Sequence, residues 1–146
     1  MHIRRNNNVK FIALIILFST SQLFTQNKAD DILGIWVTTN KDAHIEISKR
    51  DGKYYGIIIW NMTNDALDNK NPDQQKRTRK ITGIEILKSF VYDGDDQWDD
   101  GEIYDPESGK TYSCKIWMDD KNTLNVKGYI GFSFIGRSEV WTRKKS

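Results

Sequence analysis

The sequence is poor in cysteine and histidine. Cys114 is the single cysteine among 146 residues, and His44 is the only histidine beyond the first 21 residues. One cysteine excludes a disulfide within the chain, so the stability of the fold must come from its core. Cys114 lies in an alternating apolar stretch, which is typical of a buried small residue rather than a reactive thiol. A zinc site would need more ligands of this kind, and we expect no metal and no other cofactor.

Long hydrophobic runs are also missing. The longest, residues 11–18, reads FIALIILF and falls far short of the roughly 20 residues that span a bilayer. Three basic residues precede this run and small residues follow it, which is the order of a secretory signal peptide. We therefore expect a signal peptide over residues 1–21 and one domain over residues 22–146. The product would be exported, periplasmic or extracellular, with no membrane span after cleavage; an uncleaved membrane anchor is the alternative.

Charge of one sign is not in excess. The chain has 22 Lys and Arg and 20 Asp and Glu, and residues 1–21 hold three bases and no acid. The remaining domain, with 19 bases and 20 acids, gives no electrostatic reason to bind nucleic acid. The sequence also contains no P-loop, no nucleophile elbow and no dinucleotide fingerprint. No enzyme class is assigned on these grounds.

Acidic residues are concentrated in residues 91–112, which read VYDGDDQWDDGEIYDPESGKTY. A calcium loop of the EF-hand type that begins at Asp93 would need a ligand where Gln97 stands and a glycine where Trp98 stands. The turn interpretation fits better, because Asp-Gly is a strong hairpin signal and a proline and a glycine mark a second turn. We therefore expect a short strand over 97–105 with a hairpin at each end.

The same alternation of strands and turns covers the rest of the domain. Strands are expected over residues 34–40, 43–49, 53–62, 83–93, 97–105, 110–118, 123–131 and 132–143. Most connections are tight turns, so the sequence predicts an all-β fold: an eight-stranded antiparallel up-and-down barrel with one long polar loop between strands 3 and 4. Closure would remove the exposed edges of a monomer without disulfides, and an open sandwich of the same strands is the alternative.

Gly34, Trp36 and Arg143 carry a resemblance to the lipocalin and wider calycin barrels. In those folds the tryptophan of a G-x-W motif on the first strand closes one end of the barrel, and a basic residue of the last strand packs across it. Residues 32–143 as a whole resemble the exported bacterial family known as domain of unknown function 2147. The stretches that carry this resemblance are DGKYYGIIIW, NPDQQKRTRKITGIEILKSF, YDGDDQWDDGEIYDPESGKTYSCKIW and TLNVKGYIGFSFIGRSEVWTR. It implies a lipocalin-like barrel and export, but no settled activity.

Strand periodicity gives a set of side chains expected to point into the barrel. They are Ile45, Ile47, Ile57, Ile59, Tyr112, Ile116, Met118, Leu124 and Val126, while the parity of strands 83–93 and 132–143 is left open. An apolar lining favours an apolar chain or ring with a few polar groups to orient it. We expect those polar groups at the barrel mouth, from Arg77 and Arg79 of the long loop and from Arg137. Asp73 could instead pair with Arg77 and hold the loop in shape.

Three functions compete. The first is a binding module that holds a small apolar or amphiphilic ligand, such as a fatty acid with its tail inward. The second is an envelope interaction or structural protein whose barrel is filled by side chains. The third is an enzyme in which Glu46, Glu102 and Asp105 form a carboxylate pair. Four tryptophans are further candidates for a sugar or lipid site, although aromatic side chains on strands are more often core: Trp60, Trp98, Trp117 and Trp141.

Overall fold

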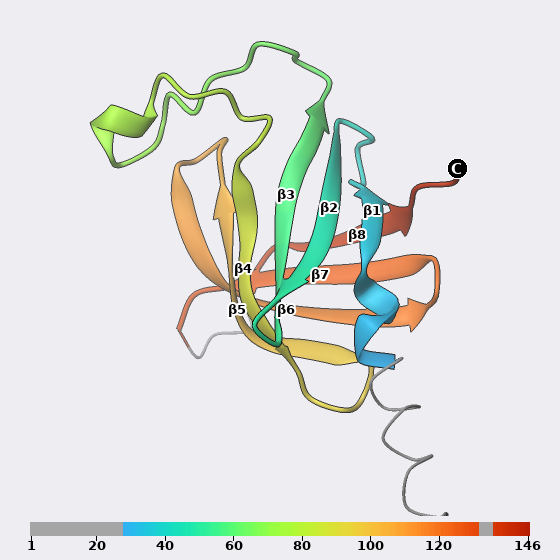
Figure 1. Ribbon diagram of the computed structural model, residues 1–146. Coiled ribbons are helices and arrows are strands. Elements are labelled where there is room, and N and C mark those ends of the chain that lie inside the picture. The colour runs from blue at the N-terminus through green and yellow to red at the C-terminus, as the bar shows by residue number, and fades with distance from the viewer. Residues whose placement is uncertain (1–27, 132–135) are drawn as a thin grey trace, which may run out of the picture.

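The computed structural model describes residues 28–131 and 136–146, which form one closed antiparallel barrel (Figure 1). Each strand pairs with the next in sequence, and β1 pairs with β8 to close the sheet. The strands are β1 (Gly34–Val37), β2 (Ala43–Arg50), β3 (Lys53–Asn61), β4 (Glu85–Tyr92), β5 (Gln97–Asp105), β6 (Lys110–Asp120), β7 (Thr123–Tyr129) and β8 (Ser138–Arg143). The predicted all-β, eight-stranded, up-and-down barrel is therefore confirmed. Within these ranges, no helix is long and apolar enough to cross a membrane.

The acidic stretch consists of turns and a strand, as the hairpin signals predict. The Asp93 side chain accepts the backbone N–H of Asp95, and the Asp105 side chain accepts that of Glu107. Both are local turn contacts in which a short acidic side chain takes the place of a backbone acceptor. Among the described residues, no group of three or more His, Cys, Asp or Glu side chains is arranged to hold a metal ion.

Strand β3 points the opposite way from the prediction. Ile58 is 4% exposed and faces the interior, whereas Ile59 is 37% exposed and faces outward with the half-buried Ile57. Three consecutive isoleucines are apolar on both faces, so alternation alone cannot choose between them. The pairing with β2 determines which face of β3 points inward, because the buried Ile45 lies opposite Ile58 and the exposed Glu46 lies opposite Ile57.

The parity of β4 could not be read from the sequence because it changes within the strand. Leu87 and Phe90, three residues apart, are both buried. Between them Ser89 has a φ of +62°, in the left-handed region, which interrupts the regular alternation of a strand. In β8 the parity is regular, with Trp141 buried and Val140 exposed. The first residues of the expected eighth strand, 132–135, lie outside the described part of the chain.

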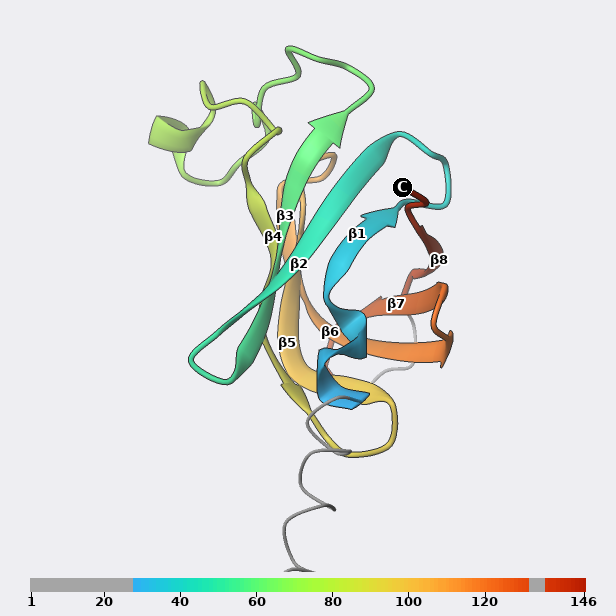
Figure 2. The same ribbon diagram turned by 45° about the vertical axis from the view of Figure 1, so that its right-hand side comes forward.

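One end of the barrel is closed by a short 3-10 helix, η1 (Asp30–Ile32), which lies beneath β1 (Figures 1 and 2). Trp36 is fully buried there and donates from its indole nitrogen to the Ile32 carbonyl at 2.9 Å. The Arg143 guanidinium stacks on the Trp36 ring at 4.3 Å and donates to the carbonyls of Asp31, Leu33 and Lys121. The predicted packing of Trp36 against Arg143 is confirmed.

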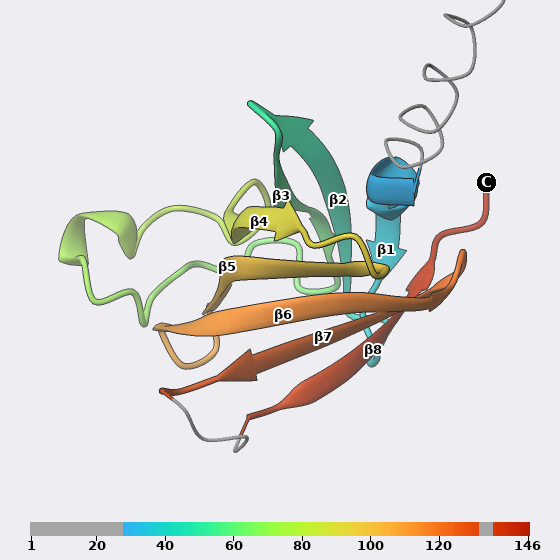
Figure 3. The same ribbon diagram turned by 90° about the horizontal axis from the view of Figure 1, so that it is seen from below.

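The long segment 62–84 lies outside the barrel, beside β4 and β5 (Figure 3). It contains a second 3-10 helix, η2 (Gln74–Lys76), and is anchored by Asp68, which is fully buried. Asp68 accepts hydrogen bonds from the Tyr104 hydroxyl and the Asn71 amide and forms an ion pair with Arg79 at 2.9 Å. A buried carboxylate with three partners is compensated for its loss of hydration, so this cluster fixes the segment to β5.

Candidate functional site

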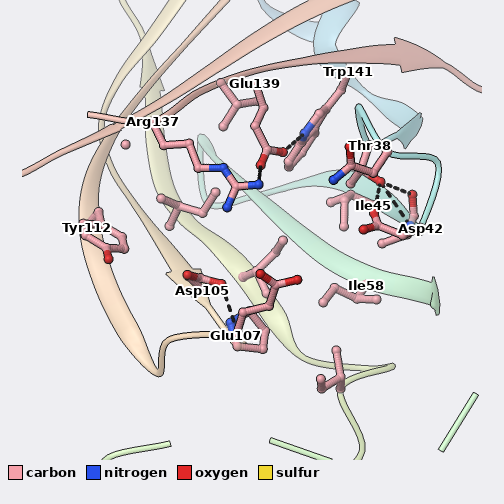
Figure 4. Close-up of a pocket in the computed structure, with 18 of the residues that line it drawn as sticks. Thr38, Asp42, Ile45, Ile58, Asp105, Glu107, Tyr112, Arg137, Glu139 and Trp141 are labelled. Carbon is pink, nitrogen blue, oxygen red and sulfur yellow. Dashed lines mark hydrogen bonds and ion pairs between the residues drawn. The ribbon is translucent and has the colours of Figure 1, made fainter. Parts of the chain in front are cut away.

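The candidate site is a cavity of about 510 Å³ in the end of the barrel opposite η1 (Figure 4). In an up-and-down barrel the ends of odd strands and the starts of even strands meet at one rim. The cavity is lined from this rim, by the β1–β2 turn, the end of β3, the β5–β6 turn and the residues before β8. Topology therefore brings together residues that are up to about 100 positions apart in the sequence.

The wall of the cavity is apolar. It consists of Ala43, Ile45, Ile58, Ile86, Ile103, Val126 and Trp141, contributed by β2, β3, β4, β5, β7 and β8. Among them, Ile45 and Val126 are almost fully buried. A ligand that enters this space would exchange water contacts for aliphatic and aromatic ones, which is the usual source of affinity in such sites.

The rim is charged and mainly acidic. Asp42 comes from the β1–β2 turn, Asp105 and Glu107 from the β5–β6 turn, and Glu139 from β8. Arg137 is the one basic residue that lines the cavity in the described chain. Figure 4 shows Arg137 and Glu139 on one side of the cavity and Asp105 and Glu107 on the other.

Hydrogen bonds fix several of the rim groups. Glu139 accepts from the Arg137 guanidinium at 2.9 Å with one carboxylate oxygen and from the Trp141 indole at 2.9 Å with the other. Asp42 accepts from the Thr38 hydroxyl at 2.6 Å. These side chains are therefore preorganised, which reduces the entropic cost of ordering them when a ligand binds.

The structure brings some of the predicted site residues together and separates others. Ile45, Tyr112 and Arg137 line the cavity, as predicted. Ile47 and Ile116 are buried and Met118 packs against the core, but all three lie below the cavity, toward the closed end. They point inward as predicted, yet neighbouring side chains fill the space around them.

Arg77 and Arg79 do not line the cavity, so their predicted place at the mouth is wrong. Arg79 is held by buried Asp68, and the Arg77 side chain donates to the Asn71 carbonyl at 2.7 Å. Both hold the long segment in shape on the outside of the barrel. The predicted pairing of Asp73 with Arg77 is also replaced, since Asp73 pairs with Lys76 and caps η2.

The three carboxylates considered for catalysis do not gather. Glu46 and Glu102 are exposed on the outer face of β2 and β5, and only Asp105 lines the cavity. Cys114 is fully buried, and burial raises the pKa of its thiol to about 12, which keeps it protonated. The carboxylates therefore do not form the pair considered for them, whereas Cys114 is the buried small residue that the alternating stretch predicts.

Other candidates from the sequence lie elsewhere. Trp141 lines the cavity, while Trp98 is buried near η1 and donates to the Ala29 carbonyl. Trp60 is exposed on β3 and stacks on His44, with ring centroids 4.6 Å apart. Burial, followed by nearby Lys144, lowers the pKa of His44.

Sequence reasoning missed Asp42, Glu107 and Glu139 as site residues. A signal for them was available, because each stands beside the end of an odd strand or the start of an even one. In an up-and-down barrel all such positions share one rim, so acids at these positions gather at the same end of the barrel. The clustering of basic residues in the long polar segment was the more conspicuous feature, but it belongs to a different surface.

Comparison with known proteins supports the architecture. A family model described as "Uncharacterized protein conserved in bacteria (DUF2147)" matches residues 34–143. Among solved structures, protein HP1028 from Helicobacter pylori, described as belonging to the lipocalin family, is similar with a TM-score of 0.70 and 22% identity. That match covers 77% of this chain and 82% of the other, and at this identity it shows a shared fold. No curated protein matches the chain. From its sequence match over nearly the whole barrel, this chain belongs to the DUF2147 family of uncharacterized bacterial proteins.

Proposed function

We propose that the protein binds a small, partly apolar molecule in the open half of its barrel. The observation that carries the proposal is the cavity of about 510 Å³, with an apolar wall and a polar rim. Its size lies within the roughly 300–1,000 Å³ that small-molecule sites occupy. A site of this build orients an amphiphile with its apolar part inward and its polar part at the rim.

Packing at the other end supports this proposal. Trp36 and Trp98 fill the closed end, and their burial supplies a core without help from a ligand. At the open end, the described residues leave a cavity of about 510 Å³. A barrel filled throughout would suit the alternative of an interaction or structural protein.

A filling substitution with a matched control tests the proposal. Ile58→Trp adds bulk to the cavity wall, while Ile59→Trp adds the same bulk one residue away on the outer face. We expect the neutral fluorescent probe N-phenyl-1-naphthylamine to bind the wild type and Ile59→Trp in a saturable manner, and Ile58→Trp at least about tenfold more weakly.

A second variant covers the case in which Ile58→Trp is too destabilised to interpret. Ile103 also lines the cavity but is only half-buried, so Ile103→Trp would extend into open space. Thermal melts identify the folded variants. Equal probe binding by wild type and both filling variants would contradict the proposal and favour the interaction-protein alternative. Native mass spectrometry of protein purified from its own host would then identify any retained ligand.

We further propose that the protein is exported, with cleavage after Ser21. The support is the order of charges and apolar residues in positions 1–21, a segment that lies outside the described residues. The intact mass of the protein recovered from its host measures the result directly. A product that still begins at Met1 would contradict export by this route.

A further inference from the structure

We infer that the cavity takes an organic cation: an amphiphile whose apolar part fills the barrel and whose ammonium group lies at the rim. This inference rests on the proposed function and makes it more specific. It reverses the charge expected from the sequence, where arginines at the mouth favoured an anionic head group. Three observations carry it: the balance of charge, the state of the arginine and the aromatic rings.

The balance of charge around the cavity is negative. Four carboxylates, from Asp42, Asp105, Glu107 and Glu139, line it together with one guanidinium in the described chain, an excess of three negative charges. An anionic head group at this rim would meet repulsion from each carboxylate. A cation would be attracted, and low-dielectric walls strengthen this difference relative to bulk water.

The single cation of the rim is already engaged. Arg137 pairs with Glu139 at 2.9 Å, and Glu139 in turn is held by the Trp141 indole. The ion pair uses one nitrogen of the guanidinium, and the Glu139 carboxylate beside it offsets its positive charge. An anionic ligand at Arg137 would therefore lie close to the negative charge of Glu139, which makes the pair a poor site for a carboxylate or a phosphate.

Glu107 is the carboxylate best placed to meet a ligand. Both oxygens of Asp105 accept hydrogen bonds, from the Glu107 backbone N–H and the Ser108 hydroxyl, and both oxygens of Glu139 are also occupied. No hydrogen bond or ion pair of the Glu107 carboxylate is present among the described residues. In Figure 4 it lies across the cavity from Arg137. Asp42, whose one oxygen is bonded to Thr38, is the second available group.

Aromatic rings supply an observation independent of the acids. Tyr112, Tyr129 and Trp141 all line the cavity. Carboxylates combined with aromatic faces favour ammonium groups, because a ring attracts a cation through its quadrupole and offers an anion nothing comparable. A purely fatty-acid site would need neither feature.

The test compares three ligands of equal chain length by isothermal titration calorimetry: decylammonium, decan-1-ol and decanoate, each below its micelle concentration. We expect decylammonium to bind at least about tenfold more tightly than decanoate, with decanol between them. Raising the salt from about 0.01 M to about 1 M shortens the Debye length from about 30 Å to about 3 Å and should reduce this preference.

Charge-removing variants locate the effect. Glu107→Gln should weaken decylammonium binding about threefold, and Asp42→Asn with Glu107→Gln about tenfold, while decanol binding changes little. Glu46→Gln is the matched control, since Glu46 is exposed on the outer face of β2 and does not line the cavity. It should leave all three affinities unchanged.

The possible failures are distinguishable. If none of the three ligands binds, the proposed function fails along with the inference. If decanoate or decanol binds as tightly as decylammonium, the cavity is a site but the inference of a cation is overturned. A preference for decylammonium that survives both rim substitutions would also overturn it, because the carboxylates would not be its cause.

Discussion

The two ends of the barrel are built from the same eight strands but differ in what fills them. At the closed end Trp36 and Trp98 are fully buried, and their indole nitrogens donate to the carbonyls of Ile32 and Ala29. At the open end a cavity of about 510 Å³ remains, surrounded by carboxylates. Backbone pairing alone does not account for this difference, because the same closed sheet of eight strands surrounds both ends.

Side-chain size accounts for it. Near the middle of the barrel, Gly56 and Gly101 leave room that Leu87 and Phe90 occupy, and a Cβ on Gly101 would lie 2.4 Å from the Phe90 ring. Toward the open end the small residues Ala43, Val126 and Gly128 line the cavity, and the side chains of the described residues leave about 510 Å³ unfilled. The closed end is therefore expected to determine stability, and the open end to determine binding.

The largest effect should come from Trp36→Ala. The substitution removes a fully buried aromatic side chain, its bond to Ile32 and the surface on which Arg143 stacks. We expect it to lower the free energy of unfolding by roughly 3–5 kcal/mol. Chemical denaturation followed by far-UV circular dichroism measures the change. A midpoint equal to that of the wild type would show that the closed end does not carry the stability assigned to it.

Arg143→Lys should have the second largest effect. The Arg143 guanidinium donates to three backbone carbonyls while stacking on Trp36, an arrangement that a lysine ammonium cannot reproduce. Because the part-buried carbonyls of Asp31 and Leu33 would lose partners, we expect a loss of about 2 kcal/mol in the free energy of unfolding. Arg77→Lys is the comparison, since Arg77 makes one backbone contact in the outer segment. Equal losses in the two variants would contradict a special role for the closed end.

The packing at the closed end was predicted from the sequence, whereas most residues that line the cavity at the open end were not. Gly34, Trp36 and Arg143 predicted the closure through their resemblance to the G-x-W pattern of lipocalin barrels, and β1 and β8 pair Trp36 directly with Arg143. Turn signals placed the boundaries of β5 correctly, since Asp-Gly before the strand and the Pro106 and Gly109 turn after it act locally. A motif of known position and local turn chemistry were sufficient for these features.

The site depended on contacts between distant segments. The inward face of β3 was decided by its register against β2, which a run of three isoleucines cannot reveal. Arg79 forms an ion pair with Asp68 instead of lying at the mouth. Asp68 is buried where the long segment packs on Tyr104, a contact that the sequence does not reveal. Such pairings follow from tertiary packing, so charge patterns along the sequence were a poor guide to the rim.

A smaller, pH-dependent effect is expected at the closed end from Asp30→Asn. The Tyr54 hydroxyl donates to the Asp30 carboxylate at 2.7 Å, and this bond, with help from Lys49, lowers the pKa of Asp30. A lowered folded-state pKa contributes stability above the unfolded pKa, near 3.9, which is lost as the pH falls through the folded value. Asp30→Asn should therefore be less stable than wild type at pH 7, by roughly 0.5–1 kcal/mol, and the difference should shrink below about pH 4.

Thermal melts of the two proteins between pH 7 and pH 2 measure this difference. Glu46→Gln serves as the control, because it removes an exposed charge of β2 that makes no hydrogen bond or ion pair among the described residues. A difference between Asp30→Asn and wild type that stays constant down to pH 2 would show that the charge of Asp30 is not what stabilises its contact with Tyr54.

The smallest effect on stability should come from the open end, with Glu107→Gln. The Glu107 side chain is exposed, and it lines the same cavity as the carboxylates of Asp42, Asp105 and Glu139. Removing its charge eliminates repulsion and breaks no hydrogen bond of that carboxylate among the described residues, so the free energy of unfolding should change by less than about 0.5 kcal/mol. Any change should be a gain, and salt should diminish it, because screening already weakens repulsion between exposed charges. Denaturant midpoints at low and high salt measure this. A loss of stability comparable to that of Arg143→Lys would mean that the rim is part of the structural framework, and the division of the barrel into a stabilising end and a binding end would have to be abandoned.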